Sequence, residues 1–183
     1  MGARIQIVQG GHAVGNQPDT VIATLLGSCI AVCLHDAQAH VGGMNHFLLG
    51  EPENTKPLSP ADLQCYGIHA MELLINAMMA VGAKRDRLRA HIYGGANMIA
   101  GMSAIGRRNA EFARSFVEME QIAIGRIDVG GTSARRVEFM PYEGRARAMA
   151  AVEADPISRQ RTMAPLPTPR PAGDLELFSP QGR

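Results

Sequence analysis

Residues 20–49 read TVIATLLGSCIAVCLHDAQAHVGGMNHFLL, and this stretch decides the fold. It contains three runs of apolar and β-branched residues, 20–26, 30–35 and 41–49, and such runs predict strands. Gly27-Ser28 separates the first two runs, so we expect the chain to turn sharply there. A short polar segment separates the second run from the third, which allows these two strands to pair as an antiparallel hairpin.

Strands and helices alternate outside this stretch. A surface loop is expected over 50–60, and Ser59-Pro60-Ala61-Asp62 has the cap, proline and acid of a helix start. That helix is expected to end at Gly82, and a second helix to span 107–120. The expected apolar face of the first helix consists of Leu63, Tyr66, Ala70, Leu74, Met78 and Val81. The second helix is expected to bury Phe112, Phe116 and Met119. The other expected strands are 5–8, 88–93, 122–129, 135–140 and 145–151, which together predict a mixed α/β fold.

The composition fits one globular domain, with 46% hydrophobic and 19% charged residues. Lys and Arg number 18 against 17 Asp and Glu, and this net charge of +1 argues against binding to nucleic acid or an anionic membrane. No apolar run reaches the roughly 18 residues of a membrane span, so we expect no membrane insertion. The N-terminus lacks a signal-peptide pattern. Three cysteines make no disulfide framework, which favours the reducing cytoplasm.

The composition changes near Asp155. Residues 156–183 contain six of the eleven prolines of the chain, and proline interrupts both helices and sheets. We therefore expect a domain over residues 1–154 and a proline-rich, flexible tail over residues 155–183.

Cys29 is the best candidate nucleophile among the thiols. It follows Gly27-Ser28, where a sharp turn leaves backbone N–H groups free to point at a developing oxyanion. Cys33 lies further along an apolar strand and is expected to be a small buried hydrophobe. Cys65 lies near the start of a helix and has no obvious basic partner.

His46 is the histidine most closely tied to Cys29. It lies inside an apolar run, where an imidazole needs a polar partner because its burial is otherwise costly. If the hairpin forms, the antiparallel register brings His46 back towards Cys29, and an imidazole there can activate the thiol. The alternative from spacing alone is a hydrogen-bonded core histidine and a cysteine that only belongs to a turn.

Two other kinds of site are less well supported. A metal site would draw on Cys29, Cys33, His35, His40 and His46. These residues lack a paired C-x-x-C or H-x-x-x-H spacing, so we expect no metal. Gly94-Gly95 lacks the pattern of a phosphate-binding loop and is expected to mark a close backbone crossing near the site.

Several ordered motifs carry a family resemblance. TLLGSCIAVCL (24–34) and GGMNHFLL (42–49) are followed by GGANM (94–98), IGRRN (105–109) and DVGGTSARRVEF (128–139). Together they resemble the CheD family, the chemoreceptor glutamine deamidases of bacterial chemotaxis. The resemblance covers roughly residues 5–150.

The resemblance implies a fold and a site. The fold is a single-domain, mixed-sheet, three-layer α/β sandwich related to the catalytic domain of cytotoxic necrotizing factor toxins. The site is a Cys-His-Thr arrangement with Cys29 as nucleophile, His46 as base and Thr24 orienting the imidazole. Backbone N–H groups around Gly27 and Ser28 hold the oxyanion, and no cofactor or metal takes part.

The resemblance also implies a reaction and its partners. The reaction is hydrolysis of glutamine side-chain amides on the helical cytoplasmic domain of methyl-accepting chemoreceptors, with release of ammonia. A CheC-type phosphatase is a second implied partner, so a mainly non-enzymatic chemotaxis adaptor is the alternative function. A thiol amidase acting on small molecules is the third.

Overall fold

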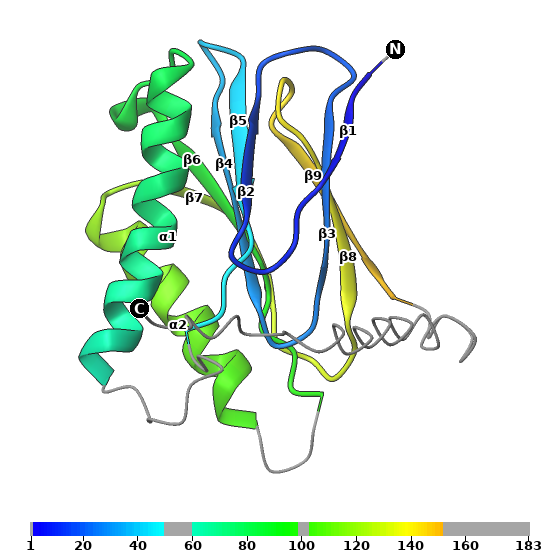
Figure 1. Ribbon diagram of the computed structural model, residues 1–183, viewed down its shortest axis with the longest axis vertical. Coiled ribbons are helices and arrows are strands. Elements are labelled where there is room, and N and C mark those ends of the chain that lie inside the picture. The colour runs from blue at the N-terminus through cyan, green and yellow to red at the C-terminus, as the bar shows by residue number, and fades with distance from the viewer. Residues whose placement is uncertain (1, 50–59, 99–102, 152–183) are drawn as a thin grey trace, which may run out of the picture. The chain divides into compact units, whose positions relative to one another are not determined.

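The computed structural model describes residues 2–49, 60–98 and 103–151, without the side chains of residues 60–65 and 103 (Figure 1). The predicted loop before the first helix, the proline-rich tail and the side chains of Leu63 and Cys65 therefore lie outside the described residues. Among the described helices, none has the length and apolar character required to cross a membrane.

Within these residues the strands form two sheets. The four-stranded sheet has the order β1 (Arg4–Gln6), β3 (Val21–Leu26), β8 (Arg135–Met140) and β9 (Arg145–Ala150). The five-stranded sheet has the order β2 (His12–Gly15), β5 (Val41–Asn45), β4 (Ile30–Asp36), β6 (Arg89–Gly94) and β7 (Ala123–Val129). The helices are α1 (Pro60–Ala80), the short 3₁₀ helix Arg85–Arg87 and α2 (Ser103–Met119). Each sheet contains one parallel pair, β1 with β3 and β6 with β7, so both sheets are mixed.

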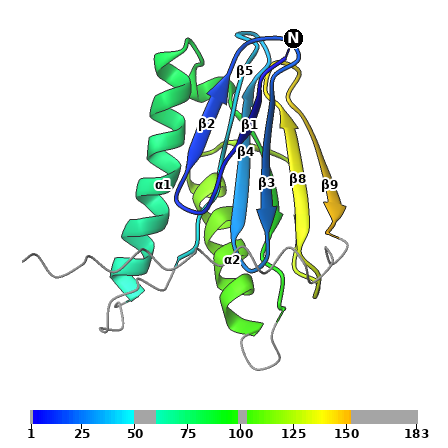
Figure 2. The ribbon, with the colours of Figure 1, turned by 45° about the vertical axis from the view of Figure 1, so that its right-hand side comes forward.

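The α-helices cover one face of the five-stranded sheet, and the four-stranded sheet packs against its other face (Figures 1 and 2). Leu74, Ile92 and Phe116 belong to the core on the helical side, whereas Ile22 and Phe139 belong to the core between the sheets. A strand buried on both faces reads as a continuous apolar run, which explains why β4 shows no alternation. The predicted mixed α/β class is confirmed.

The predicted hairpin is present. Strands β4 and β5 are antiparallel, with Asp36 opposite Val41 and Cys33 opposite Met44. The predicted sharp turn at Gly27-Ser28 is also present, and β3 and β4, which it connects, do not pair with each other. They belong to different sheets, and the turn carries the chain from one sheet to the other (Figure 1).

Two strand predictions were incomplete. β2 was not predicted, because His12–Gly15 is only four residues long and carries one strongly apolar side chain. β5 ends at Asn45, four residues before the predicted end of its run. The apolar pattern continues because Phe47 still packs against the helices after the regular strand has ended.

The predicted helix faces were partly wrong. Tyr66 is 60% exposed, because the face of α1 that meets α2 passes through Gly67, where a Cβ would overlap the Phe112 ring. Val81 and Met119 are also exposed, since Val81 follows the end of α1 and Met119 is the last residue of α2. The apolar pattern of each helix therefore continues beyond the helical turns that pack against the sheet.

Asp36 closes the hairpin with a buried carboxylate. It accepts hydrogen bonds from the Arg87 guanidinium and from the backbone N–H groups of Lys84, Gln38 and Ala39. Burial alone would raise the pKa of Asp36, but these donors lower it to about 2. Asp36 thus joins the hairpin turn to the segment that leads into β6.

We expect Asp36→Ala to lower the free energy of unfolding by about 3 kcal/mol, because it leaves the half-buried Arg87 and three backbone donors without their acceptor. Urea unfolding followed by circular dichroism measures this. Asp86→Ala is the matched control, since Asp86 is exposed and should change stability by less than about 0.5 kcal/mol. Equal effects of the two variants would contradict a structural role for Asp36.

Candidate active site

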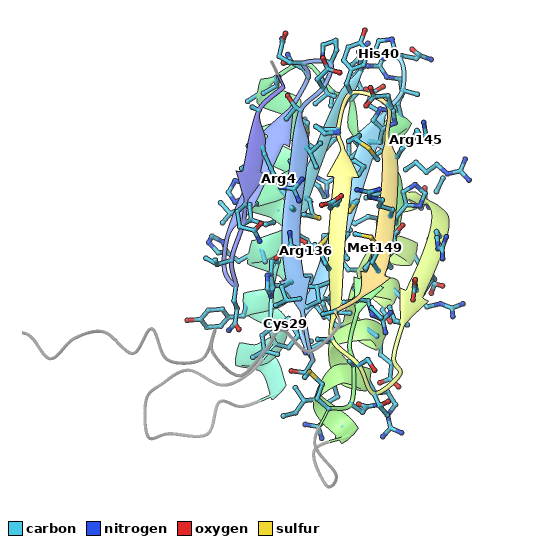
Figure 3. All side chains as sticks on the ribbon, turned by 90° about the vertical axis from the view of Figure 1, so that its right-hand side faces the viewer. Arg4, Cys29, His40, Arg136, Arg145 and Met149 are labelled. Carbon is cyan, nitrogen blue, oxygen red and sulfur yellow. The ribbon has the colours of Figure 1, made fainter. Side chains whose placement is uncertain are left out.

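The candidate nucleophile and base lie on neighbouring segments and face the same way. Ile30 and Phe47 are paired by two backbone hydrogen bonds of 3.0 and 2.9 Å, and both side chains pack on the helical side. Cys29 and His46 each precede one of these residues, so their side chains point to the opposite face, between the two sheets. Diagonal neighbours of this kind lie about 7–8 Å apart at Cα, and their side chains can approach further. Figure 3 shows Cys29 at the end of the four-stranded sheet where β3 leads into β4.

Thr24 sets the tautomer of His46. The Thr24 Oγ1 atom lies 2.8 Å from His46 Nδ1, and the hydroxyl donates its single proton to the Ile7 carbonyl at 2.9 Å. Because a hydroxyl has only one proton, Oγ1 must accept from Nδ1–H of the imidazole. Neutral His46 therefore carries its proton on Nδ1 and a lone pair on Nε2.

The lone pair of His46 is buried and available. His46 is 6% exposed, and its Nε2 atom has no hydrogen-bond partner within the described residues. Burial lowers the pKa of His46 to about 4, which keeps the ring neutral at physiological pH. A neutral imidazole with an open nitrogen has the chemistry of a general base, which makes His46 a candidate for that role on the same side of the sheet as Cys29.

The Cys29 thiol is half-buried and protonated at rest. Burial raises its pKa, and a hydrogen bond from the backbone N–H of Cys29 offsets this only in part. The thiol donates to Gln9 Oε1 with an Sγ–Oε1 distance of 3.4 Å. The resting pair is thus a neutral thiol and a neutral imidazole, and nucleophilic attack requires transfer of the thiol proton.

The turn before β4 has its carbonyl groups fixed by hydrogen bonds from other segments. Gly27 O accepts from Ala96 N at 2.9 Å, and Cys29 O accepts from Gly95 N at 2.8 Å. Within the described parts of the chain, neither Ser28 N–H nor Cys29 N–H donates to another residue. Fixed carbonyls hold the turn in place, which makes these two N–H groups the candidate donors to an oxyanion, although Cys29 N–H bonds its own sulfur at rest.

Asn109 is a supporting residue that the sequence did not single out. Its Nδ2 atom donates to Ser28 O at 2.8 Å, and its Oδ1 atom accepts from Leu49 N at 3.0 Å. One buried amide on α2 therefore joins the turn that bears Cys29 to the segment after His46. A polar side chain inside the IGRRN motif was the only available signal.

Gly94 and Gly95 mark a close backbone crossing, as predicted. Gly94 has φ of +113°, and a Cβ there would overlap the Cys29 carbonyl oxygen. Gly95 has φ of +65° and donates the hydrogen bond to that same oxygen. The glycine pair allows β6 to fix the backbone position of Cys29.

The other candidate ligands of a metal lie elsewhere. His35 and His40 each lie within hydrogen-bond distance of the Tyr142 carbonyl, at 3.2 and 3.4 Å, and the His40 ring stacks on Tyr142. Cys33 is fully buried, which raises the pKa of its thiol, as expected of a small core residue. No cluster of three or more His, Cys, Asp or Glu residues suited to a metal occurs in the described ranges.

Residues 48–149 match the family model described as CheD chemotactic sensory transduction. This range begins after Cys29 and His46, so the match does not bear on the candidate site.

Three curated relatives carry the name probable chemoreceptor glutamine deamidase CheD. The protein of Zymomonas mobilis is 49% identical over 175 residues, which cover 96% of this chain and 92% of the relative. That of Rhizobium meliloti is 48% identical over 181 residues, 97% of both chains. That of Caulobacter vibrioides is 45% identical over 179 residues, 96% of this chain and 93% of the relative.

Among solved structures, the Bacillus licheniformis hypothetical protein YfiH is similar with a TM-score of 0.42 and 15% identity. The similarity covers 64% of this chain and 49% of that one. The sequence relatives, by contrast, match this chain over nearly its whole length. On that match and on the family model, the chain belongs to the CheD family.

Proposed function

We propose that this protein is a cysteine-dependent glutamine deamidase that converts glutamine side chains of methyl-accepting chemoreceptors to glutamate and releases ammonia. The observation that carries the proposal is the neutral His46, which is anchored to Thr24 through Nδ1 and has no partner for Nε2 within the described residues, on the same side of the sheet as Cys29. The relatives named chemoreceptor glutamine deamidase support the choice of substrate and the place in bacterial chemotaxis.

The first half of the reaction forms a thioester. Cys29 gives its proton to His46 Nε2, and the thiolate attacks the side-chain amide carbon of the substrate glutamine. The N–H groups of Ser28 and Cys29 stabilise the oxyanion, an interaction worth roughly 3 kcal/mol for one such donor in comparable enzymes. His46 then returns the proton to the nitrogen, because ammonia leaves readily and an amide anion does not.

The second half regenerates the enzyme. His46 removes a proton from a water molecule, which attacks the thioester carbon and releases the glutamate side chain. The thiolate recovers its proton from His46, so the net reaction consumes one water and releases one ammonia. These steps require only protons, a thiol and water, and we therefore propose no cofactor and no metal.

Thr24 is proposed as the residue that orients the imidazole. A neutral hydroxyl accepts from Nδ1–H, so the imidazolium formed during the reaction is held without a neighbouring carboxylate. We expect Thr24→Val to lower kcat about 10-fold to 100-fold, because the ring then loses its fixed tautomer and direction. Ammonia release on a receptor cytoplasmic domain measures this, and Thr24→Ser should restore most of the rate. A wild-type kcat in Thr24→Val would remove Thr24 from the site.

The setting of the enzyme is part of the proposal. Helices on one face of a sheet and a second sheet on the other support the three-layer α/β sandwich, whose kinship with necrotizing factor toxins is proposed from the family resemblance alone. We propose a deamidase domain over residues 1–154, followed by the proline-rich segment 155–183, and a cytoplasmic location. The partners are the helical cytoplasmic domain of chemoreceptors and a CheC-type phosphatase.

The direct test is mass spectrometry of a receptor cytoplasmic domain incubated with the protein. Deamidation adds one dalton at each modified glutamine, and ammonia appears in equal amount. Binding of the receptor without a mass gain would instead identify the protein as an adaptor. Turnover of free glutamine without turnover of receptor would identify a small-molecule amidase.

A further inference from the structure

A glutamine of the protein itself lies against the nucleophile. Gln9 lies between β1 and β2, and its Oε1 atom accepts the hydrogen bond from the Cys29 thiol at 3.4 Å. Its side-chain carboxamide is the same chemical group that the proposed reaction hydrolyses. The carbonyl oxygen of Gln9, rather than its carbon, faces the sulfur.

The backbone around Gln9 is anchored to the other site residues. Gly10 N donates to His46 O at 2.7 Å, and His46 N donates to Gly11 O at 3.0 Å. Thr24 donates to the carbonyl of Ile7 on the other side of Gln9. The Gln9 residue itself is exposed, so its side chain can move away while the backbone stays in place.

The single proton of the Cys29 thiol is directed at Gln9 and not at His46. A thiol has a single hydrogen and can donate to one good acceptor at a time. In this structure the acceptor is Gln9 Oε1, while the buried Nε2 of His46 has no partner within the described residues. The base and the nucleophile therefore face the same space without being hydrogen-bonded to each other.

We propose that Gln9 is a resident substrate mimic, whose carboxamide holds the Cys29 thiol in a resting rotamer until a substrate glutamine displaces it. This inference rests on the proposed function, since it uses Cys29 as nucleophile and a carboxamide as substrate. Displacement frees the thiol to turn to His46 Nε2, so activation is coupled to arrival of the substrate. Gln9 is thereby a positioning residue that acts through Cys29.

The test measures alkylation of Cys29 by iodoacetamide as a function of pH, read by peptide mass spectrometry in the full-length protein. Gln9→Met keeps the length of the side chain but cannot accept the thiol proton. It should lower the apparent pKa of Cys29 and speed alkylation at neutral pH about 3-fold to 10-fold, the size of one lost hydrogen bond. Gln9→Glu should have the opposite effect, because a carboxylate beside the sulfur disfavours the thiolate.

Gln6→Met is the matched control. Gln6 lies on β1, where its neighbour Ile5 packs between the sheets, so the Gln6 side chain points the other way and alkylation should not change. A second readout is the KM for receptor, which should fall in Gln9→Met because the internal competitor is gone.

Three outcomes would overturn the proposal. The first is an unchanged alkylation profile in Gln9→Met. The second is faster alkylation only in a further variant, Gln9→Ala, which would show that the Gln9 side chain merely covers the thiol. The third is a one-dalton mass gain at Gln9, which would make Gln9 a substrate. Each outcome is read beside receptor deamidation in the same samples. If Gln9 proves not to act as a substrate mimic but receptor deamidation still requires Cys29, only the Gln9 proposal fails. If receptor deamidation does not require Cys29, the proposed function itself fails.

Discussion

Cys29→Ala is expected to lower the rate of receptor deamidation by about 10⁴-fold or more, the usual consequence of removing a nucleophile. Without Sγ there is no thioester, and water must attack the amide directly. The substitution removes one half-buried sulfur and its bond to Gln9, so the free energy of unfolding should change by no more than about 1 kcal/mol. Ammonia release and thermal unfolding, measured on the same preparation, separate lost chemistry from lost structure.

Cys33→Ala is the control for this substitution. Cys33 lies on β4 and is fully buried between the sheets, so its truncation should cost about 1 kcal/mol of stability and leave the rate near that of the wild type. Turnover in Cys29→Ala comparable to that of the unmodified chain would refute the assignment of the nucleophile. Equal loss of activity in both variants would point to a structural effect instead.

His46→Gln is expected to lower kcat about 10²-fold to 10⁴-fold, because it removes the general base and the general acid of the same cycle. Glutamine fills much of the ring's volume and keeps a polar group near Thr24. The residual rate should increase with pH, since hydroxide then generates the thiolate that the base no longer provides. A variant rate within a few-fold of the wild type would leave His46 as a buried core residue only.

The pH profile of the wild-type enzyme tests the state of His46 directly. The ring must be neutral to accept the thiol proton, and burial lowers its pKa from 6.5 to about 4. The value of kcat/KM should therefore hold constant as the pH falls through 6.5 and decrease only near pH 4. A decrease centred on pH 6.5 in the free enzyme would show a solvated imidazole and contradict the buried base.

The hairpin within residues 20–49 could be predicted because its turn is short and its apolar runs are long. Those two features set the register, and the register brings His46 next to the segment that starts at Cys29. The partner of the imidazole could not be found in the same way. Thr24 belongs to the other sheet, and its approach to His46 depends on how the sheets pack, which spacing does not encode.

Gln9 and Asn109 show a second limit of the sequence. Gln9 reaches Cys29 across 20 positions and Asn109 reaches Ser28 across 81, and no local periodicity connects such residues. The errors at Tyr66 and Met119 have the opposite origin. There the local pattern was apolar, but the neighbouring surface that would cover it is absent at those turns within the described part of the chain.

Because Thr24 and the Cys29–His46 pair come from different sheets, the candidate site lies between the two sheets and not on the surface of one of them. The proposed activity therefore depends on how the two sheets pack against each other. A distortion that shifts one sheet relative to the other by a fraction of a residue would break the hydrogen bond between Thr24 Oγ1 and His46 Nδ1 while every strand remains intact. A ligand that binds between the two sheets and separates them would inactivate the enzyme without contacting Cys29 Sγ.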